Sequence, residues 1–293
     1  MAKGRHLKSR IRSVQNTRKI TRTMELVAAS KLKRAQDRVR GARPYAEALA
    51  SVISDLVTPE LAEQFPLLQR PRPPAEGGPN RAAVIVITSN RGLAGGFNAN
   101  LSKEALARVT ELEAAGYEVD IHAIGRKGAG YFRYLGRPPA SVRQDIGDKP
   151  TTRQAGEVMD GLVEAFEAGT LASVDLIYAR FNSAMSTPPT LMPILPVVPR
   201  ERGAATRPDF IFRPAAADIA GRLLPLYVRN QLFRGLVESA ASEHGARRTA
   251  MKSATDNAGD IIKHLQRTYN KQRQAQITQE IAEIVGGAAA LEG

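Results

Sequence analysis

Hydrophobic residues recur at heptad spacing through the first 56 residues of the chain. Alternating steps of four and three residues from Leu7 reach Ile11 and Val14, and later run from Ala28 through Leu32 to the mid-fifties. This seam predicts one amphipathic helix over residues 3–56 that packs against another helix. Its many alanines would allow a helix separation near the short end of the usual range of about 8–10 Å.

Polar residues interrupt this seam in its N-terminal half, at Arg18, Thr21 and Glu25. The apolar residues there are instead Ile20, Met24 and Val27. This change predicts that the buried face of the helix rotates locally across the gap. Pro44 is the position where a proline ring could kink the helix.

A second heptad pattern covers residues 218–290 and predicts another long helix, with Pro225 marking its start or a kink. Steps from Phe233 pass through Val237, His244, Met251, Ala254, Ala258, Ile261 and Leu265. A second stripe appears near the end, with Ile277, Ile281, Ile284, Ala288 and Leu291. A helix with two apolar faces is usually surrounded by partners.

Between the two helices the pattern changes twice. Residues 66–80 are rich in proline and glycine and predict a linker. Residues 81–213 alternate strand-like runs (82–88, 118–124 and 174–181) with helical ones (99–115, 128–135 and 152–168), which predicts a Rossmann-like α/β domain with at least partly parallel strands. The expected domains are a helix over 1–60, a linker over 61–80, the α/β domain over 81–213 and a helix over 214–293.

Neither long helix can bury its seam alone. We therefore expect an antiparallel coiled coil of the N- and C-terminal helices, with the α/β domain inserted between them. The second helix is the longer one, so its bi-apolar C-terminal end would project bare. An exposed apolar helix end predicts a partner protein with a complementary apolar pocket that surrounds it.

Charge and composition narrow the classes of partner. The net charge of +13 favours an acidic partner: nucleic acid, anionic lipid or an acidic protein surface. The chain has no cysteine, which excludes disulfides and thiol chemistry and suits a reducing compartment. No apolar run approaches the roughly 20 residues that span a bilayer.

Candidate chemistry is sparse. The loop at residues 88–98 (TSNRGLAGGFN) lies between a strand and a helix, where phosphate-binding loops occur, but its glycines do not fit G-x-G-x-x-G. Ser89 lacks a nucleophile-elbow motif, and His122 in a strand is best read as a core residue. We expect no catalytic residue, no cofactor and no metal. A basic coiled-coil nucleic-acid binder and a nucleotide-dependent α/β enzyme remain as alternatives.

Four segments together resemble the gamma subunit of F-type ATP synthase. They are residues 7–36 (LKSRIRSVQNTRKITRTMELVAASKLKRAQ), the loop at 88–98, residues 241–256 (ASEHGARRTAMKSATD) and residues 269–291 (YNKQRQAQITQEIAEIVGGAAAL). The two terminal segments are highly specific, and the four follow in the family's order along the whole chain.

The resemblance implies a non-catalytic central rotor stalk, one copy per complex, that couples proton flow to ATP synthesis. The implied partners are a ring of alpha and beta subunits, the epsilon subunit and the membrane-embedded c-ring, with no nucleic acid. The family's coupling positions fall on Met24, Arg247, Arg273, Gln274, Thr278 and Glu280.

Departures from the family pattern are small. Asn90 and Ala94 stand where many members carry Asp and Cys, which affects only hydrogen bonding in the loop. The cysteine-containing regulatory insertion of the chloroplast form is absent, so thiol switching is not expected. Because the family motif begins within the first ten residues, we expect a bacterial protein without a transit peptide, peripheral on the cytoplasmic face of the plasma membrane.

Overall fold

The computed structural model describes residues 2–71, 73–198 and 215–291. Two long helices, α1 (Ala2–Leu56) and α6 (Ala216–Leu291), flank all other elements in the sequence. The chain forms two compact units, one of Met1–Val27 with Arg248–Gly293 and one of Ala28–Arg247. Both helices contribute to each unit.

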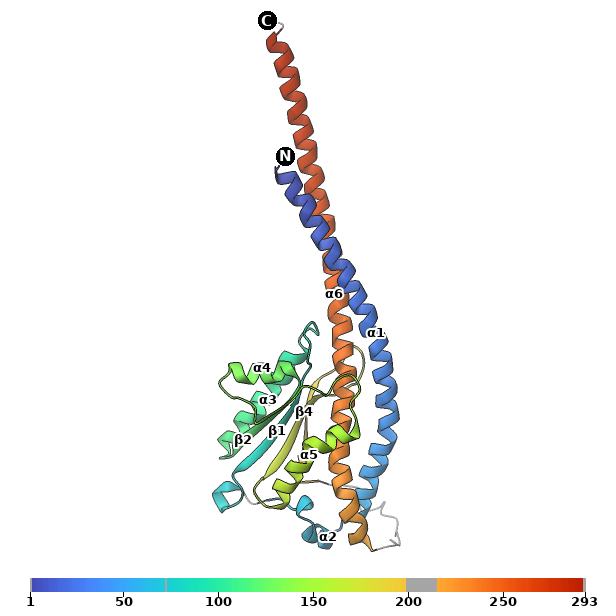
Figure 1. Cartoon of the computed structure of the whole chain (residues 1–293), viewed down its shortest axis with the longest axis vertical. Helices are drawn as coiled ribbons and strands as arrows, with labels where there is room; N and C mark the ends of the chain where they lie inside the picture. Colours follow the sequence, from blue (N-terminus) through green and yellow to red (C-terminus); the bar gives the residue numbers. More distant parts are fainter. Residues whose placement is uncertain (1, 72, 199–214, 292–293) are drawn as a thin grey trace. The chain divides into compact units, whose positions relative to one another are not determined.

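In the first unit, the N-terminal part of α1 packs against α6 in antiparallel orientation (Figure 1). The seam of α1 remains buried through its polar positions, because Thr21 and Glu25 are 9% and 8% exposed. The predicted local rotation of the buried face is wrong, since Ile20 and Val27 are 61% and 52% exposed.

Local hydrogen bonds explain why polar residues are tolerated in this seam. Thr21 Oγ1 lies 2.8 Å from Thr255 Oγ1 of the facing helix and also donates to the carbonyl of Arg18. Glu25 forms an ion pair with Arg22 at 2.9 Å, one turn earlier on α1. Each buried polar group therefore has a partner, which removes most of the cost of burying it.

The buried stripe of α6 in this unit differs slightly from the predicted one. Thr255 and Ile262 are buried, whereas the predicted seam residue Ile261 is 47% exposed. The predicted seam residues Met251, Ala258 and Leu265 are buried, so the seven-residue spacing is kept and only the positions between them differ.

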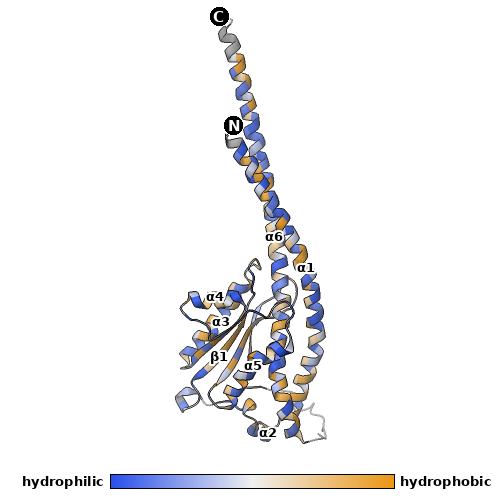
Figure 2. Cartoon of the chain, in the orientation of Figure 1, coloured by the Kyte–Doolittle hydropathy of each residue, from blue (hydrophilic) through white to orange (hydrophobic). Residues whose placement is uncertain are grey.

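The C-terminal length of α6 is bare, as the two-stripe pattern predicts. Leu265 is the last buried residue among those described, and α6 runs on beyond the N-terminal end of α1 (Figure 1). Ile277, Ile281, Ile284 and Val285 are between 46% and 72% exposed, and apolar positions recur along this length (Figure 2). The side chains of Ala288 and Leu291 lie outside the described part.

The second unit contains a five-stranded sheet in the order β3-β2-β1-β4-β5. Strands β1 (Arg81–Ile87), β2 (Glu118–Ile124), β3 (Ser141–Arg143) and β4 (Ser173–Ala179) are parallel, and β5 (Pro189–Leu195) is antiparallel to β4. The predicted fold class, an α/β domain inserted between two long helices, is confirmed.

Helices cover both faces of this sheet (Figure 1). On one face, α3 (Phe97–Ala114) and α4 (Arg126–Tyr134) pack on alternate residues of β1, including Val84 and Val86. On the other face, α5 (Thr152–Glu167) and the first turns of α6 pack on Ile85 and Ile87. Because β1 is central and buried on both faces, it is a continuous apolar run rather than an alternating one.

Several elements were not predicted from the pattern. The short strand β3 and the strand β5, which contains two prolines, carry weak periodicity. The Pro-rich segment 66–80 is partly structured, because Leu67 and Leu68 are buried after the helix α2 (Pro59–Gln64) and Leu67 accepts a backbone hydrogen bond from Val197. The 3-10 turns at Pro66–Leu68 and Pro74–Glu76 complete the segment, and residue 72 lies outside the described part.

Pro44 and Pro225 both lie inside continuous helices. The interpretation of Pro225 as a helix start is therefore wrong, because α6 begins at Ala216. Residues 199–213, which the sequence pattern assigned to the α/β domain, lie outside the described part. Among the described residues, no helix combines the length and apolarity that a membrane span requires.

Candidate functional site: the joint between the long helices and the α/β domain

Three loops leave the same edge of the sheet within the second unit. They follow β1, β3 and β4, and their strands are mutually parallel, so all three leave the carboxyl edge. In doubly wound folds this edge is where ligands usually bind. Here all three loops contact the long helices instead.

The loop after β4 is held by a buried charged residue of α6. Glu238 is 1% exposed, and its Oε2 accepts the backbone N–H of Phe181 at 3.2 Å while its Oε1 accepts from Arg234 Nε at 3.0 Å. From α1, Arg43 Nη2 donates to the Phe181 carbonyl at 3.2 Å. Both backbone polar groups of Phe181 are thus satisfied by helix side chains.

The last residue of β4 is bonded in the same manner. Ser239 Oγ accepts the N–H of Ala179 at 3.2 Å, and Ser242 Oγ donates to the Ala179 carbonyl at 3.0 Å. Nearby, the absence of a side chain at Gly245 lets α6 approach Ala184, since an added Cβ would lie 3.3 Å from its carbonyl oxygen. These contacts attach the β4–β5 connection to α6 along one helix face.

The loop after β3 reaches both helices at one residue, Asp148. Lys31 Nζ of α1 lies 2.5 Å from Asp148 Oδ2, and Arg38 Nη1 of α1 donates to its carbonyl at 2.7 Å. His244 Nε2 of α6 lies 3.1 Å from Oδ1. His244 and Lys31 hold the pKa of the Asp148 carboxyl well below its ordinary value, against the opposite effect of partial burial.

The loop after β1 contacts Arg247, one of the coupling positions that the resemblance implies. Arg247 Nη2 donates to the carbonyl of Gly92 at 3.3 Å and forms an ion pair with Glu243 at 2.6 Å. Only 11% of the Arg247 side chain is exposed. The structure therefore gives Arg247 a position inside the joint.

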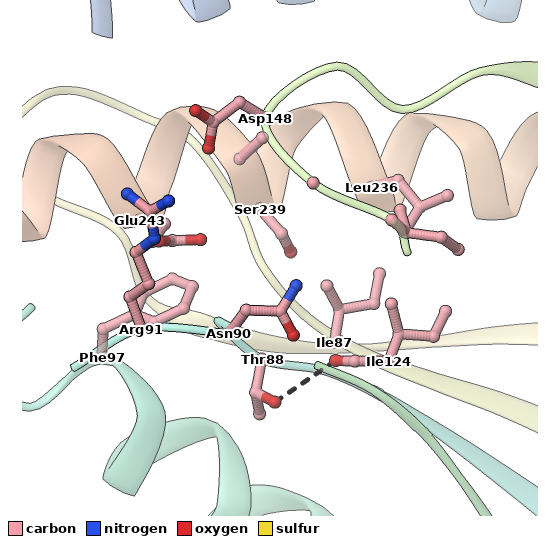
Figure 3. Close-up of a pocket in the computed structure, with 13 residues that line it drawn as sticks. Ile87, Thr88, Asn90, Arg91, Phe97, Ile124, Asp148, Leu236, Ser239 and Glu243 are labelled. Atoms are coloured by element: carbon pink, nitrogen blue, oxygen red, sulfur yellow. Dashed lines mark hydrogen bonds between the residues drawn. The ribbon is translucent and has the colours of Figure 1, made fainter. Parts of the chain in front are cut away.

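A cavity of about 270 Å³ lies between these loops and α6. In Figure 3, Ser239 of α6 and Asn90 of the β1 loop extend toward each other across it. Its lining mixes apolar residues from the ends of β1 and β2, Ile87 and Ile124, with the carboxylates of Asp148 and Glu243. Both carboxylates already have cationic partners, so the lining favours no single class of ligand.

Phosphate binding at the start of α4 is disfavoured by the local hydrogen bonds. Its first free N–H groups donate within the chain: Arg126 to Asn90 Oδ1 at 3.0 Å, Lys127 to the Ser89 carbonyl at 3.1 Å and Gly128 to Thr88 Oγ1 at 2.9 Å. These are the donors that would otherwise hold a phosphate. The turn between β2 and α4 thus serves packing against the 88–98 loop. At the turn into α3, which the sequence raised as a phosphate-loop candidate, Ser89 N–H donates to Asn98 Oδ1 at 2.9 Å and Phe97 N–H donates to the Ala94 carbonyl at 3.3 Å.

The sequence candidates for catalysis are not brought together. Ser89 is buried and its hydroxyl contacts Asn98 and the Arg91 carbonyl, with no base beside it. His122 is half-buried in β2, its Nδ1 lies 2.7 Å from Ser141 Oγ, and burial lowers its pKa. No cluster of three or more potential metal-ligating side chains occurs among the described residues.

The remaining implied coupling positions lie in the first unit. Met24 is half-buried on α1. Arg273, Gln274, Thr278 and Glu280 are exposed on the bare length of α6, where Thr278 Oγ1 donates to the Gln274 carbonyl at 3.0 Å. These four are exposed on the same length of α6, and the contact roles of all six positions stay a prediction.

Sequence reasoning did not find Asp148 or Glu238. The i, i+4 spacing of Arg234 and Glu238 was a visible signal of a helix ion pair. Asp148 carried no such signal, because its partners Lys31, Arg38 and His244 are 117, 110 and 96 positions away in the sequence.

The fold and the joint define a class of protein: a long helical pair that carries an α/β domain and offers a bare apolar helix end to a larger assembly. The chain belongs to the ATP synthase gamma family. The family described as ATP synthase matches residues 3–291. The chain is 56% identical over 295 residues to the ATP synthase gamma chain of Gemmatimonas aurantiaca, with 100% of both chains covered.

Other relatives agree with this assignment. The ATP synthase gamma chain of Frankia casuarinae is 43% identical, with 98% of this chain and 97% of the relative covered. A chain in the cryo-EM structure of Euglena gracilis mitochondrial ATP synthase (OSCP/F1/c-ring) matches with a TM-score of 0.70 at 16% identity, covering 99% of this chain and 95% of the other. These relatives do not support the nucleic-acid-binding alternative.

Proposed function

We propose that this chain is the central rotor stalk of a proton-translocating ATP synthase and couples proton flow to ATP synthesis without catalysing a reaction itself. The observation that carries the proposal is the bare C-terminal length of α6. Its apolar residues Ile277, Ile281 and Ile284 are exposed on a gamma-family chain. A socket that surrounds this helix would bury both apolar stripes.

The proposed partners are a ring of alpha and beta subunits around the helical pair, with epsilon and the c-ring at the α/β domain, and one copy of this chain per complex. The complex would lie on the cytoplasmic face of the bacterial plasma membrane. The net charge of +13 supports acidic partner surfaces. Charge steers such contacts without fixing one orientation, which suits a part that turns.

The mechanism follows from asymmetry. A shaft whose sides differ contacts three chemically identical catalytic sites differently, so each orientation stabilises a different conformation at each site. Rotation then shifts these conformations in turn, and the shift is limited by the difference in contact free energy between orientations. An apolar end helps, because few directional bonds break on each turn.

The test is co-expression of the organism's alpha and beta subunits with and without this chain. We expect the chain to co-purify as one copy per six-subunit ring, and steady ATP hydrolysis to depend on its presence. The isolated chain serves as the control and should hydrolyse no ATP. Separate elution of the chain, with ring hydrolysis unchanged, would refute the proposal.

A further inference from the structure

The loop between β3 and α5 is attached to both long helices through one side chain. The two carboxylate oxygens of Asp148 diverge: Oδ2 lies 2.5 Å from Lys31 of α1, and Oδ1 lies 3.1 Å from His244 of α6. Arg38 of α1 adds a third contact through the Asp148 carbonyl at 2.7 Å. One residue of the α/β domain thus bridges two helices.

The partners of the Asp148 side chain lie outside the α/β domain that carries this residue. Among the described residues, the ion pairs and hydrogen bonds of its side chain are all made with the helices. Ile146, two residues earlier, is buried in the core of the domain and anchors the loop there. The loop therefore has one anchor inside the domain and one on the helical pair.

The contacts of Asp148 with the two helices contribute little to the free energy of folding, but they fix the position of the loop. The Asp148 side chain is 43% exposed, and exposed ion pairs contribute little to the free energy of folding. His244 is 2% exposed, so packing holds its ring in place. Neither of its ring nitrogens makes a hydrogen bond among the described residues, so its Nε2 meets Asp148 Oδ1 as a close polar contact at 3.1 Å. A carboxylate held between a fixed imidazole and an ammonium group resists displacement in either direction.

We propose that Asp148 is a positioning residue that locks the α/β domain to both α1 and α6 against twisting, so that torque passes through this joint. The torque-bearing role rests on the proposed rotor function, because only a rotor loads the joint. The charge of the carboxylate attracts Lys31 through one oxygen, while the other oxygen contacts His244 Nε2, which packing already holds in place.

The lock itself can be tested on the isolated full-length chain. In Asp148→Asn, we expect backbone amides of residues 144–150 to exchange hydrogen severalfold faster than in the parent, with little change in melting temperature. Asp145→Asn is the matched control, because Asp145 lies in the same loop but pairs with Arg143 of the α/β domain. Asp148→Glu should restore much of the protection. Unchanged exchange in Asp148→Asn would overturn the lock.

Torque transmission can be tested on the assembled complex. The chain has no cysteine, so Tyr134→Cys, at a position 88% exposed on α4, provides a single attachment point for a bead. With the ring fixed to a surface and rotation paused, we expect Asp148→Asn to raise the variance of the bead angle about twofold, the low end of single-residue effects on coupling. Asp145→Asn should leave the variance unchanged.

The outcomes separate the two proposals. Capture of the parent chain by the ring with equal variance in Asp148→Asn and the parent would overturn the torque-bearing role and leave the rotor function standing. Failure of the ring to capture the parent chain would overturn the rotor function and, with it, the torque-bearing role. The exchange measurement would still decide whether Asp148 fixes the loop.

Discussion

Gly125 shows how a single residue shapes the turn between β2 and α4. Its φ is +106°, and a Cβ added there would lie 2.1 Å from the Thr88 carbonyl oxygen. A positive φ is unfavourable for residues with a side chain, and no contact as short as this exists in folded proteins. Glycine is therefore required for β1 and α4 to approach each other.

Substitution of Gly125 by alanine should destabilise the α/β domain by on the order of 3 kcal/mol or more, because strain and steric overlap add. Gly130→Ala is the matched control: Gly130 lies inside α4, is exposed, and has open space at the Cβ position. That substitution should stabilise α4 by about 0.5–1 kcal/mol. Chemical unfolding followed by circular dichroism measures both, and equal effects would contradict this account.

The lowered pKa of Asp145 predicts a small loss of folding stability at acidic pH. The hydrogen bonds from Arg143 lower the pKa of its carboxyl from 3.8 to about 2. A lowered pKa in the folded state contributes stability above the unfolded value, which is lost as the pH falls through the folded value. Since the side chain is 52% exposed, solvent screens the pair and the effect is small.

The carboxyl resonance of Asp145 should therefore titrate near pH 2 in an NMR experiment. In Arg143→Gln it should move back toward its ordinary pKa, and the contribution of Asp145 to the loss of stability on acidification should disappear, because its folded and unfolded pKa values become equal. A carboxyl of Asp145 that titrates identically in both proteins would show that Arg143 does not hold it.

Met24→Lys should uncouple ATP hydrolysis from proton pumping in the assembled complex, as the resemblance implies for this position. Met24 is half-buried, so an added ammonium group would meet a contact surface and bind it in one orientation. Val27→Lys, one turn away on α1 and 52% exposed, is the control. Proton pumping per ATP, measured in membrane vesicles, should fall only in Met24→Lys, and normal pumping by that variant would remove Met24 from the coupling positions.

At the scale of elements, the pairing of α1 with α6 tolerates Thr21 because it pairs with Thr255 across the seam. Thr21 and Thr255 are both buried and their hydroxyl oxygens lie 2.8 Å apart. Removing one hydroxyl leaves the other without its cross-helix partner, whereas removing both leaves an apolar contact of similar shape. The energetic effects of the two substitutions should therefore not add.

Thr255→Val alone should cost about 1 kcal/mol, and Thr21→Val with Thr255→Val should recover most of that cost. A double-mutant cycle on the full-length chain, followed by the helical circular dichroism signal, measures the coupling. Strictly additive effects would show that the two hydroxyls do not interact.

At the scale of the whole molecule, the residues that stabilise the fold differ from those that are exposed for contact with partners. No side chain between residues 266 and 286 is buried, so this length of α6 contributes little to folding. Deletion of residues 277–293 should leave the melting temperature of the isolated chain unchanged but weaken torque in the assembled ring. Leu265→Ala, which removes a buried side chain, should cost roughly 2–5 kcal/mol.

Rotation assays on the ring, with a bead on the α/β domain, measure the torque of the deletion variant. The melting temperatures of the isolated chains provide the comparison. A large loss of melting temperature on deletion would mean that the C-terminal residues belong to the folded core, contrary to their exposure.

The sequence alone determined the two long helices, the main parallel strands and the bare C-terminal end. These features depend on local periodicity, which is encoded in neighbouring residues. For the same reason the family motifs were readable without a structure. The contact roles at residues 273–280 stay predictions, because they depend on partner chains.

Tertiary structure alone decided the face of α1 at Thr21 and Glu25, where hydrogen bonds and an ion pair outweighed the apolar preference for Ile20 and Val27. It also decided the joint at Asp148, whose partners on α1 and α6 are far away in the sequence. A charged side chain can pair with any group of opposite charge that the fold brings beside it. A local sequence pattern therefore does not predict its partner.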